Sequence, residues 1–171
     1  METIRRLTEE DAAQYYAVRL RALREHPEAF GSAAELFEQR TLKQVSDQFR
    51  SNSLESFCLF GAFVDMQLVG LSAFGCPVEN PKMRHRGGIY QMYVAPEARG
   101  CGLGLKLLEA AIDHARQFGQ VEELILGVAV GNDAARDLYL RAGFQTHYVD
   151  PHSLKVNERY YDTEFMRLRL T

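Results

Sequence analysis

The spacing of apolar residues along the chain predicts two kinds of element. Apolar runs rich in strand-forming residues predict strands at 4–7, 57–64, 68–76, 89–94, 123–130, 144–149 and 163–170. Helical spacing predicts a helix from Thr8 with its apolar side at positions 12, 16, 20 and 23, and further helices at 41–50, 103–118 and 133–142. Residues 28–40 fit neither pattern.

Short polar and glycine signals mark the ends of several elements. Thr8 and Asp11 resemble a capping box, and the first helix ends near Pro27 because the residue before a proline disfavours helix. Residues 65–67 join two strands as a hairpin, and Gly143 is a typical C-terminal cap. Residues 77–88 are expected to form a loop.

The order of these elements, β-α-α-β-β-β-α-β-α-β-β, predicts one sheet. The fold class is α/β, in the mixed α+β sense: a single mixed, mostly antiparallel sheet with a central β-α-β crossover and helices on both faces. No repeat, low-complexity segment or long linker divides the chain, so we expect residues 1–171 to form a single domain.

A glycine-rich hexapeptide lies between a predicted strand and a predicted helix. It reads Arg99-Gly100-Cys101-Gly102-Leu103-Gly104. Unpaired amide N–H groups and the helix dipole favour an anion at such a helix start, and Arg99 adds a charged fork. The dinucleotide pattern G-x-G-x-x-G fails because the third glycine is one residue early, and no Walker motif is present. The alternative is a glycine-rich turn with an incidental arginine.

A second motif follows the strand at 123–130. Asn132 is a good helix N-cap, and Tyr139 lies seven residues later, so both side chains can face the same side. Taken singly, Asn132 could be a plain cap and Tyr139 a core aromatic residue.

Together the two motifs resemble those of the GNAT superfamily of acetyl-CoA-dependent N-acetyltransferases. The resemblance rests on Arg-x-x-Gly-x-Gly and, about thirty residues later, Asn-x-x-Ala-x-x-x-Tyr followed by Gly-Phe. It covers residues 89–144, and the element order from 4 to 170 is compatible with that fold. It implies acetyl-CoA as co-substrate, with cofactor-binding residues Met92, Tyr93, Val94, Arg99, Gly100, Cys101, Gly102, Leu103, Gly104, Leu105 and Asn132.

The resemblance also implies how these residues act. Backbone groups of Met92 and Val94 would bind the pantetheine arm, the amides of residues 99–104 the pyrophosphate, and the Asn132 side chain the pantetheine. Tyr139 would stand near the thioester sulfur and donate a proton to the departing thiolate. Direct attack by the amine needs no covalent enzyme intermediate, so Cys101 contributes its amide rather than its thiol.

The general base is left open by the sequence. Some relatives carry a glutamate five residues before the asparagine, where this chain has Gly127, and Gln91 on the preceding strand cannot act as a base. Either water relays the proton to Glu79 or His85, or the amine arrives deprotonated. Tyr160 and Tyr161 either cover the acceptor site or pack against the sheet, and residues 152–159 would suit a substrate loop.

Charge narrows the classes of partner. The net charge of −3 argues against general nucleic-acid binding. Between Lys82 and Lys106, five Lys and Arg residues against one acid, Glu97, give a local charge of +4. This basic segment fits a polyanionic cofactor at the glycine loop, and the alternative for residues 82–86 is a solvated charged loop.

The remaining composition predicts a cytoplasmic protein without metal or membrane partner. The three cysteines are odd in number and lack metal-ligand spacing, and no signal-peptide or membrane-spanning stretch is present. We expect an N-acetyltransferase acting on a primary amine of a small molecule. The alternatives are a protein N-terminal or lysine acetyltransferase and a non-catalytic acyl-CoA-binding module; a homodimer is left open.

Overall fold

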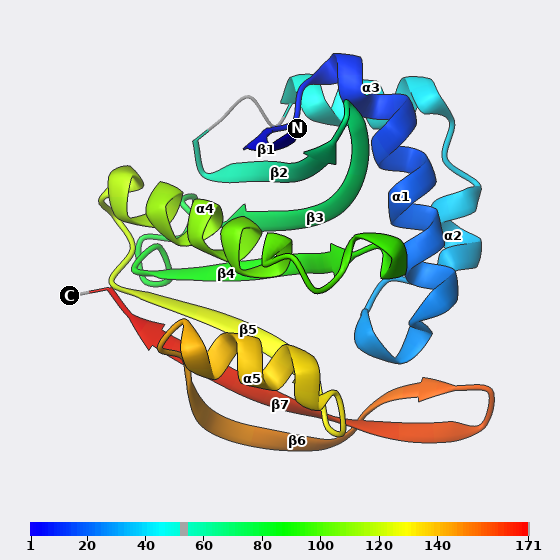
Figure 1. The fold of residues 1–171 in the computed structure, drawn as a ribbon. Coiled ribbons are helices and arrows are strands. Elements are labelled where there is room, and N and C mark those ends of the chain that lie inside the picture. The colour runs from blue at the N-terminus through cyan, green and yellow to red at the C-terminus, as the bar shows by residue number, and fades with distance from the viewer. Residues whose placement is uncertain (52–54, 171) are drawn as a thin grey trace.

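Seven strands in the order β1-β2-β3-β4-β5-β7-β6 form one sheet in the computed structural model, which describes residues 1–51 and 55–170 (Figure 1). The strands are β1 (Glu2–Arg6), β2 (Phe57–Val64), β3 (Gln67–Gly75), β4 (Arg86–Val94), β5 (Glu123–Ala129), β6 (Gln145–Val156) and β7 (Arg159–Arg169). Neighbouring strands are antiparallel except β4 and β5, which are parallel. The predicted fold class and the β-α-β unit at the centre of the sheet are confirmed.

Helices cover both faces of this sheet. They are α1 (Ala12–Glu25), α2 (Ala34–Glu38), α3 (Leu42–Ser51), α4 (Leu103–Phe118) and α5 (Asp133–Arg141), with single 3-10 turns η1 (Glu9–Asp11), η2 (Pro27–Ala29) and η3 (Pro96–Ala98). The segment 28–40, which the sequence left unassigned, contains the end of η2 and all of α2. The helices α1, α2 and α3 pack on one face and α4 and α5 on the other (Figure 1).

Alternation along β2 divides the core between the two faces. Cys58 and Phe60 pack beneath α4, whereas Leu59 and Phe63 pack against the α1 side. On the α4 face, Leu107, Leu108 and other apolar residues of that helix are fully buried, as its apolar side requires. Burial on both faces fixes the register of the central strands, because a slip of one residue would exchange the two faces.

The side of the first helix that faces the core is shifted from the predicted one: Ala12 and Leu23 are buried as predicted, whereas Tyr16 and Leu20 only pack at the edge of the core. Its buried residues are Ala12, Tyr15, Arg19, Ala22 and Leu23, while Tyr16 and Leu20 are half-buried. The predicted apolar side placed positions 16 and 20 inward because they are apolar. The prediction missed Arg19, which is buried although it is charged, because the spacing of apolar residues cannot identify a buried charged residue.

The last two strands are longer than predicted. Residues 152–159, expected to form a loop, instead extend β6 and β7 into a hairpin that closes at Asn157 and Glu158, both at positive φ. This hairpin projects beyond the rest of the sheet (Figure 1). Most of its β6 residues are exposed, so the apolar pattern that marks a half-buried strand is missing there.

No helix in the described part of the chain combines the length and apolar composition needed to cross a membrane.

Candidate functional site

The parallel strands β4 and β5 pair only near their beginnings. The register joins Arg86, Gly87 and Gly88 to residues 123–125, and the two strands diverge beyond that point. A bulge in β4 accompanies the divergence: the register to β3 shifts, and Gln91 adopts φ +57°. The Tyr15 hydroxyl donates a hydrogen bond of 3.0 Å to Gln91 Oε1 and supports the bulge from α1.

Two cavities occupy the space opened by these strands. One, of about 690 Å³, lies between β4, β5, the β6–β7 hairpin and the segment around η2, and we call it the hairpin-side cavity. The other, of about 630 Å³, lies along the end of β4, the glycine loop and α5, and we call it the loop-side cavity. Met92, Asn132 and Tyr139 line both, so the cavities meet at these residues.

The glycine loop presents free backbone donors to the loop-side cavity. Gly100 and Gly102 adopt φ +87° and +82°, a region that favours glycine, and a Cβ at either would point into open space. Helix α4 begins at Leu103 with Gly102 as its N-cap, and no side chain caps it. In the described chain the amides of residues 100–105 have no hydrogen-bond acceptor. This arrangement can bind an anion.

Arg99 reaches back from the loop to the end of β4. Its Nε donates to the Val94 carbonyl oxygen at 2.8 Å, and its Nη2 lies 3.3 Å from His26 Nε2. The guanidinium also lines the loop-side cavity, so positive charge is present beside the free amides. Cys101 is the one predicted cofactor-binding residue that does not line this cavity; its Sγ lies 3.1 Å from the Ala98 carbonyl oxygen.

Backbone groups at the end of β4 face the gap between the diverging strands β4 and β5. Ala95 N donates to Val69 O on β3, so alternation turns the backbone groups of Val94 and Met92 away from β3 and toward β5. The Val94 carbonyl already accepts from Arg99, which leaves the Val94 amide and both groups of Met92 for an extended amide-containing ligand.

Asn132 caps α5 and keeps its amide group available. Its Oδ1 accepts a hydrogen bond of 3.2 Å from Ala135 N, whereas its Nδ2 has no partner in the described chain. The cap and a ligand contact are therefore compatible, because they use different atoms of the same side chain.

Tyr139 lies on the same side of α5 as Asn132, as the seven-residue spacing predicts. Its side chain is buried, with an edge-to-face contact to Phe144 at 6.2 Å between ring centroids. Burial raises the pKa of the Tyr139 phenol above its ordinary value, so the hydroxyl stays protonated at neutral pH. Within the described residues that hydroxyl has no hydrogen-bond partner, and it lies where the two cavities meet.

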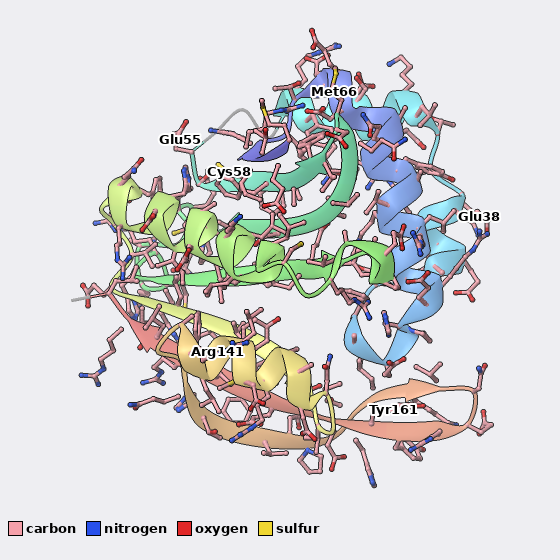
Figure 2. All side chains as sticks on the ribbon, viewed as in Figure 1. Glu38, Glu55, Cys58, Met66, Arg141 and Tyr161 are labelled. Carbon is pink, nitrogen blue, oxygen red and sulfur yellow. The ribbon has the colours of Figure 1, made fainter. Side chains whose placement is uncertain are left out.

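Several residues singled out from the sequence lie elsewhere. Neither Glu79 nor His85 lines either cavity, and the His85 carbonyl accepts from Glu122 N at the paired end of β4 and β5. Tyr160 stacks on His152, and Tyr161 lies out on the projecting hairpin (Figure 2). None of these four residues lines either cavity.

The basic segment does not gather around the glycine loop. Arg86 forms an ion pair of 2.8 Å with Glu123 at the paired end of β4, and Lys106 pairs with Glu2 at 2.7 Å. Residues 82–86 are separated from the loop by the length of β4, so the solvated charged loop is the better interpretation for Lys82 and Arg84. Arg99 alone of the five lines the loop-side cavity.

The structure adds polar, ionisable residues that sequence reasoning missed. Arg19, Glu28 and Asp150 line the hairpin-side cavity, and His26 and Arg141 line the loop-side cavity. Arg141 lies at the end of α5 (Figure 2). The sequence feature that could have pointed to the hairpin-side cavity is Arg19. It is a charged residue four positions from both Tyr15 and Leu23, on the buried side of α1.

One cluster outside the gap has the composition of a metal site. Glu55, Cys58 and His114 bring one ligand atom each within 4.8 Å of one another. However, His114 Nε2 lies 2.7 Å from the Glu55 carbonyl oxygen and 3.2 Å from Cys58 Sγ. Burial raises the pKa of the Cys58 thiol to about 11, which keeps it protonated. We therefore interpret this cluster as side chains packed together beside β2 rather than as a set of metal ligands.

The diverging pair β4 and β5 lies beside a glycine loop at the start of α4, an arrangement that can accept an extended anionic ligand. Residues 12–144 match the Acetyltransferase (GNAT) family, and the chain therefore belongs to that family. The resemblance drawn from the two motifs is confirmed.

Relatives of this chain include acetyltransferases with different names. A mycothiol acetyltransferase from Sanguibacter keddieii is 34% identical over 146 residues, covering 82% of this chain and 42% of the relative. A spermidine N(1)-acetyltransferase from Vibrio cholerae is 33% identical over 84 residues, covering 48% of this chain and 47% of the relative. The chain thus spans less than half the length of these curated relatives.

Solved structures share the whole fold. A GNAT-family acetyltransferase from Streptococcus pneumoniae superposes with a TM-score of 0.89 at 22% identity, with full coverage of both chains. The Salmonella typhimurium protein yncA, solved with its cofactor acetyl-CoA, gives 0.86 at 24% identity, covering 100% of this chain and 95% of its own. A ribosomal-protein-alanine N-acetyltransferase from Brucella melitensis gives 0.85 at 26% identity, covering 98% and 99%.

Proposed function

We propose that this chain is an N-acetyltransferase that moves an acetyl group from acetyl-CoA to the primary amine of a small molecule. The observation that carries the proposal is the meeting of two cavities at Met92, Asn132 and Tyr139. One cavity offers the donors that a diphosphate and a pantetheine arm need. The other is open to an amine from the opposite side.

The donor would lie along the loop-side cavity. The free amides after Arg99 would bind the pyrophosphate of CoA, with Leu103 to Leu105 in the first turn of α4. The amide-rich pantetheine would continue along the edge of β4 at Met92 and Val94 and reach the Asn132 side chain. Its thioester would then lie beside the Tyr139 hydroxyl.

The chemistry makes two demands that these residues can meet. As the amine attacks, negative charge develops on the thioester oxygen, and a backbone N–H of Met92 or Val94 would stabilise it; such a donor is often worth roughly 3 kcal/mol. As the tetrahedral intermediate collapses, the C–S bond breaks and the thiolate takes the proton of Tyr139. The raised pKa of the Tyr139 phenol means that the hydroxyl carries its proton at neutral pH when the thiolate forms.

The amine must lose a proton before it attacks. A lysine-like amine with a pKa of about 10.4 is neutral to only about one part in 10³ at pH 7. Glu28 and Asp150 line the hairpin-side cavity and are the carboxylates placed to accept that proton, directly or through water. The position of the family's glutamate is closed here: a Cβ at Gly127 would lie 2.9 Å from Thr163 Cγ2.

Incubation with acetyl-CoA and a library of free amines, with thiol release as the signal, tests the proposal. We expect at least one amine to accelerate thiol release and to appear as its N-acetyl product by mass spectrometry. Tight CoA binding without acceleration by any amine would contradict catalysis and favour the non-catalytic acyl-CoA-binding module.

A protein acceptor is the second candidate. The likeness to a ribosomal-protein-alanine N-acetyltransferase at 26% identity favours it. It requires peptides to be turned over faster than any free amine, and it requires a difference in protein acetylation between lysates of wild-type and deletion cells. Unchanged protein acetylation would count against it. A cytoplasmic location and a homodimer stay predictions.

Asn132 allows its two contacts to be tested separately. We expect Asn132→Asp to keep the α5 cap, because the carboxylate still accepts from Ala135 N, while the KM for acetyl-CoA rises about tenfold through loss of the amide donor. Asn132→Ala should raise the KM similarly and also destabilise the fold by about 1 kcal/mol. Thermal melting and steady-state kinetics measure both effects; an unchanged KM in Asn132→Asp would remove the pantetheine contact.

A further inference from the structure

A buried arginine without a partner faces the hairpin-side cavity. Arg19 of α1 is 5% exposed and lines this cavity. Within the described residues its guanidinium makes no hydrogen bond or ion pair, and Nη1 is fully buried without an acceptor. The guanidinium lies over the ring of Phe30, with 4.7 Å between Arg19 Cζ and the ring centroid.

The buried, unpaired guanidinium of Arg19 destabilises the folded protein unless a ligand supplies hydrogen-bond acceptors for it. A guanidinium carries five N–H donors, and a buried charge without acceptors disfavours the folded state. The face of Phe30 attracts the positive charge but accepts no in-plane hydrogen bonds, so it orients the fork without satisfying it. Burial accordingly lowers the pKa of the Arg19 guanidinium from its ordinary value.

The acids of the same cavity do not neutralise Arg19. Glu28 and Asp150 line the cavity, yet neither is within ion-pair distance of the guanidinium. The cavity therefore contains a separate positive group and separate negative groups. The same cavity is also lined by apolar side chains, including Phe57, Ile89 and Phe165. A cavity with this lining suits a small molecule that has charges of both signs and an apolar part.

We propose that the acceptor is an amine that also carries a carboxylate, in the manner of an amino acid, and that Arg19 binds this carboxylate through its fork. The inference rests on the proposed function, which it narrows to one class of acceptor. A planar carboxylate matches the paired N–H donors of a guanidinium, and the buried position would strengthen that pair. The amine of the same molecule would then point toward the junction at Tyr139.

Matched pairs of acceptors test this in the wild-type protein. Each pair is an L-amino acid and the amine left when its carboxylate is removed: leucine with isopentylamine, phenylalanine with phenethylamine, methionine with 3-(methylthio)propylamine. We expect the acid of at least one pair to have a kcat/KM at least tenfold above that of its amine. Turnover of the amines equal to or faster than that of every acid would overturn the inference while leaving the proposed function standing.

The Arg19→Met variant assigns the preference to the side chain. It keeps the bulk of the stem, so we expect unchanged CoA affinity, with the preference in kcat/KM for the acid over its amine lost. Arg19→Lys, which keeps a charge but not the fork, should retain part of the preference and replaces Arg19→Met if the latter does not fold. A full preference in both variants would overturn the assignment.

Binding of products decides the inference even without turnover. The CoA-loaded protein is titrated calorimetrically with N-acetyl-leucine, N-acetyl-phenylalanine and N-acetyl-methionine, and with the corresponding N-acetyl amines. Binding of an acid at least tenfold tighter than its amine, lost in Arg19→Met, supports Arg19 as a carboxylate site. Equal binding within all pairs overturns it. Failure of every acceptor to accelerate thiol release would instead contradict the proposed function.

Discussion

We expect the Tyr139→Phe variant to bind CoA normally and to turn over its acceptor about 10²-fold more slowly, a loss of roughly 2.7 kcal/mol of transition-state stabilisation. The phenyl ring keeps the edge-to-face contact with Phe144, so the packing of α5 is preserved. The change removes only the hydroxyl, whose proton would otherwise go to the leaving thiolate. Steady-state kinetics and calorimetry with CoA separate the two effects.

A tyrosine outside the cavities provides the matched control. Tyr160→Phe removes the same atom from an exposed ring that stacks on His152, and we expect unchanged kcat. Because burial raises the pKa of Tyr139, the wild-type rate should show no loss of the phenol proton between pH 7 and 9. Unchanged kcat in Tyr139→Phe would remove the acid role from this residue.

We expect Gly102→Val to weaken CoA binding by about two orders of magnitude. The residue adopts φ +82° and lines the loop-side cavity, and a Cβ there would enter open space, with no atom within 4 Å. The branched side chain would therefore strain the N-cap and occupy the position of the phosphates. Calorimetric titration with CoA measures the loss.

The other end of the same helix supplies the control for strain. Gly119 follows α4 at φ +72° and lines neither cavity, so Gly119→Val introduces a comparable backbone strain without touching the ligand. Both variants should melt at lower temperature, but only Gly102→Val should lose affinity. Equal affinity in the two variants would place the pyrophosphate elsewhere.

The sequence was sufficient where the signal is local. The glycine loop depends on positive φ at Gly100 and Gly102, and the N-cap depends on Asn132, so a few adjacent residues determine each structure. The seven-residue spacing to Tyr139 likewise places two side chains on one side of a single helix. The succession of strands along the chain followed from long apolar runs, which are the strongest of the sequence signals.

The hairpin-side cavity could not be predicted in the same way. Arg19, Glu28 and Asp150 come from α1, η2 and β6, and only the folded chain brings them to one wall. The local charge of +4 counted along the sequence also did not predict a basic site. Lys82 and Arg99 lie beyond opposite ends of β4, so they are far apart in the fold. The extended hairpin escaped prediction because its exposed strands have no buried side to set an apolar alternation.

The short pairing of β4 with β5 has a mechanical consequence. In the described chain the backbone hydrogen bonds that join the two halves of the sheet, β1 to β4 and β5 to β7, lie within the short segment from His85 to Gly88 and its partners at 122–125. A pantetheine arm bound at Met92 would act as an additional short strand at the splayed end and fasten the halves together. We therefore expect CoA to slow hydrogen exchange at the Met92 and Val94 amides and to raise the melting temperature of the whole domain.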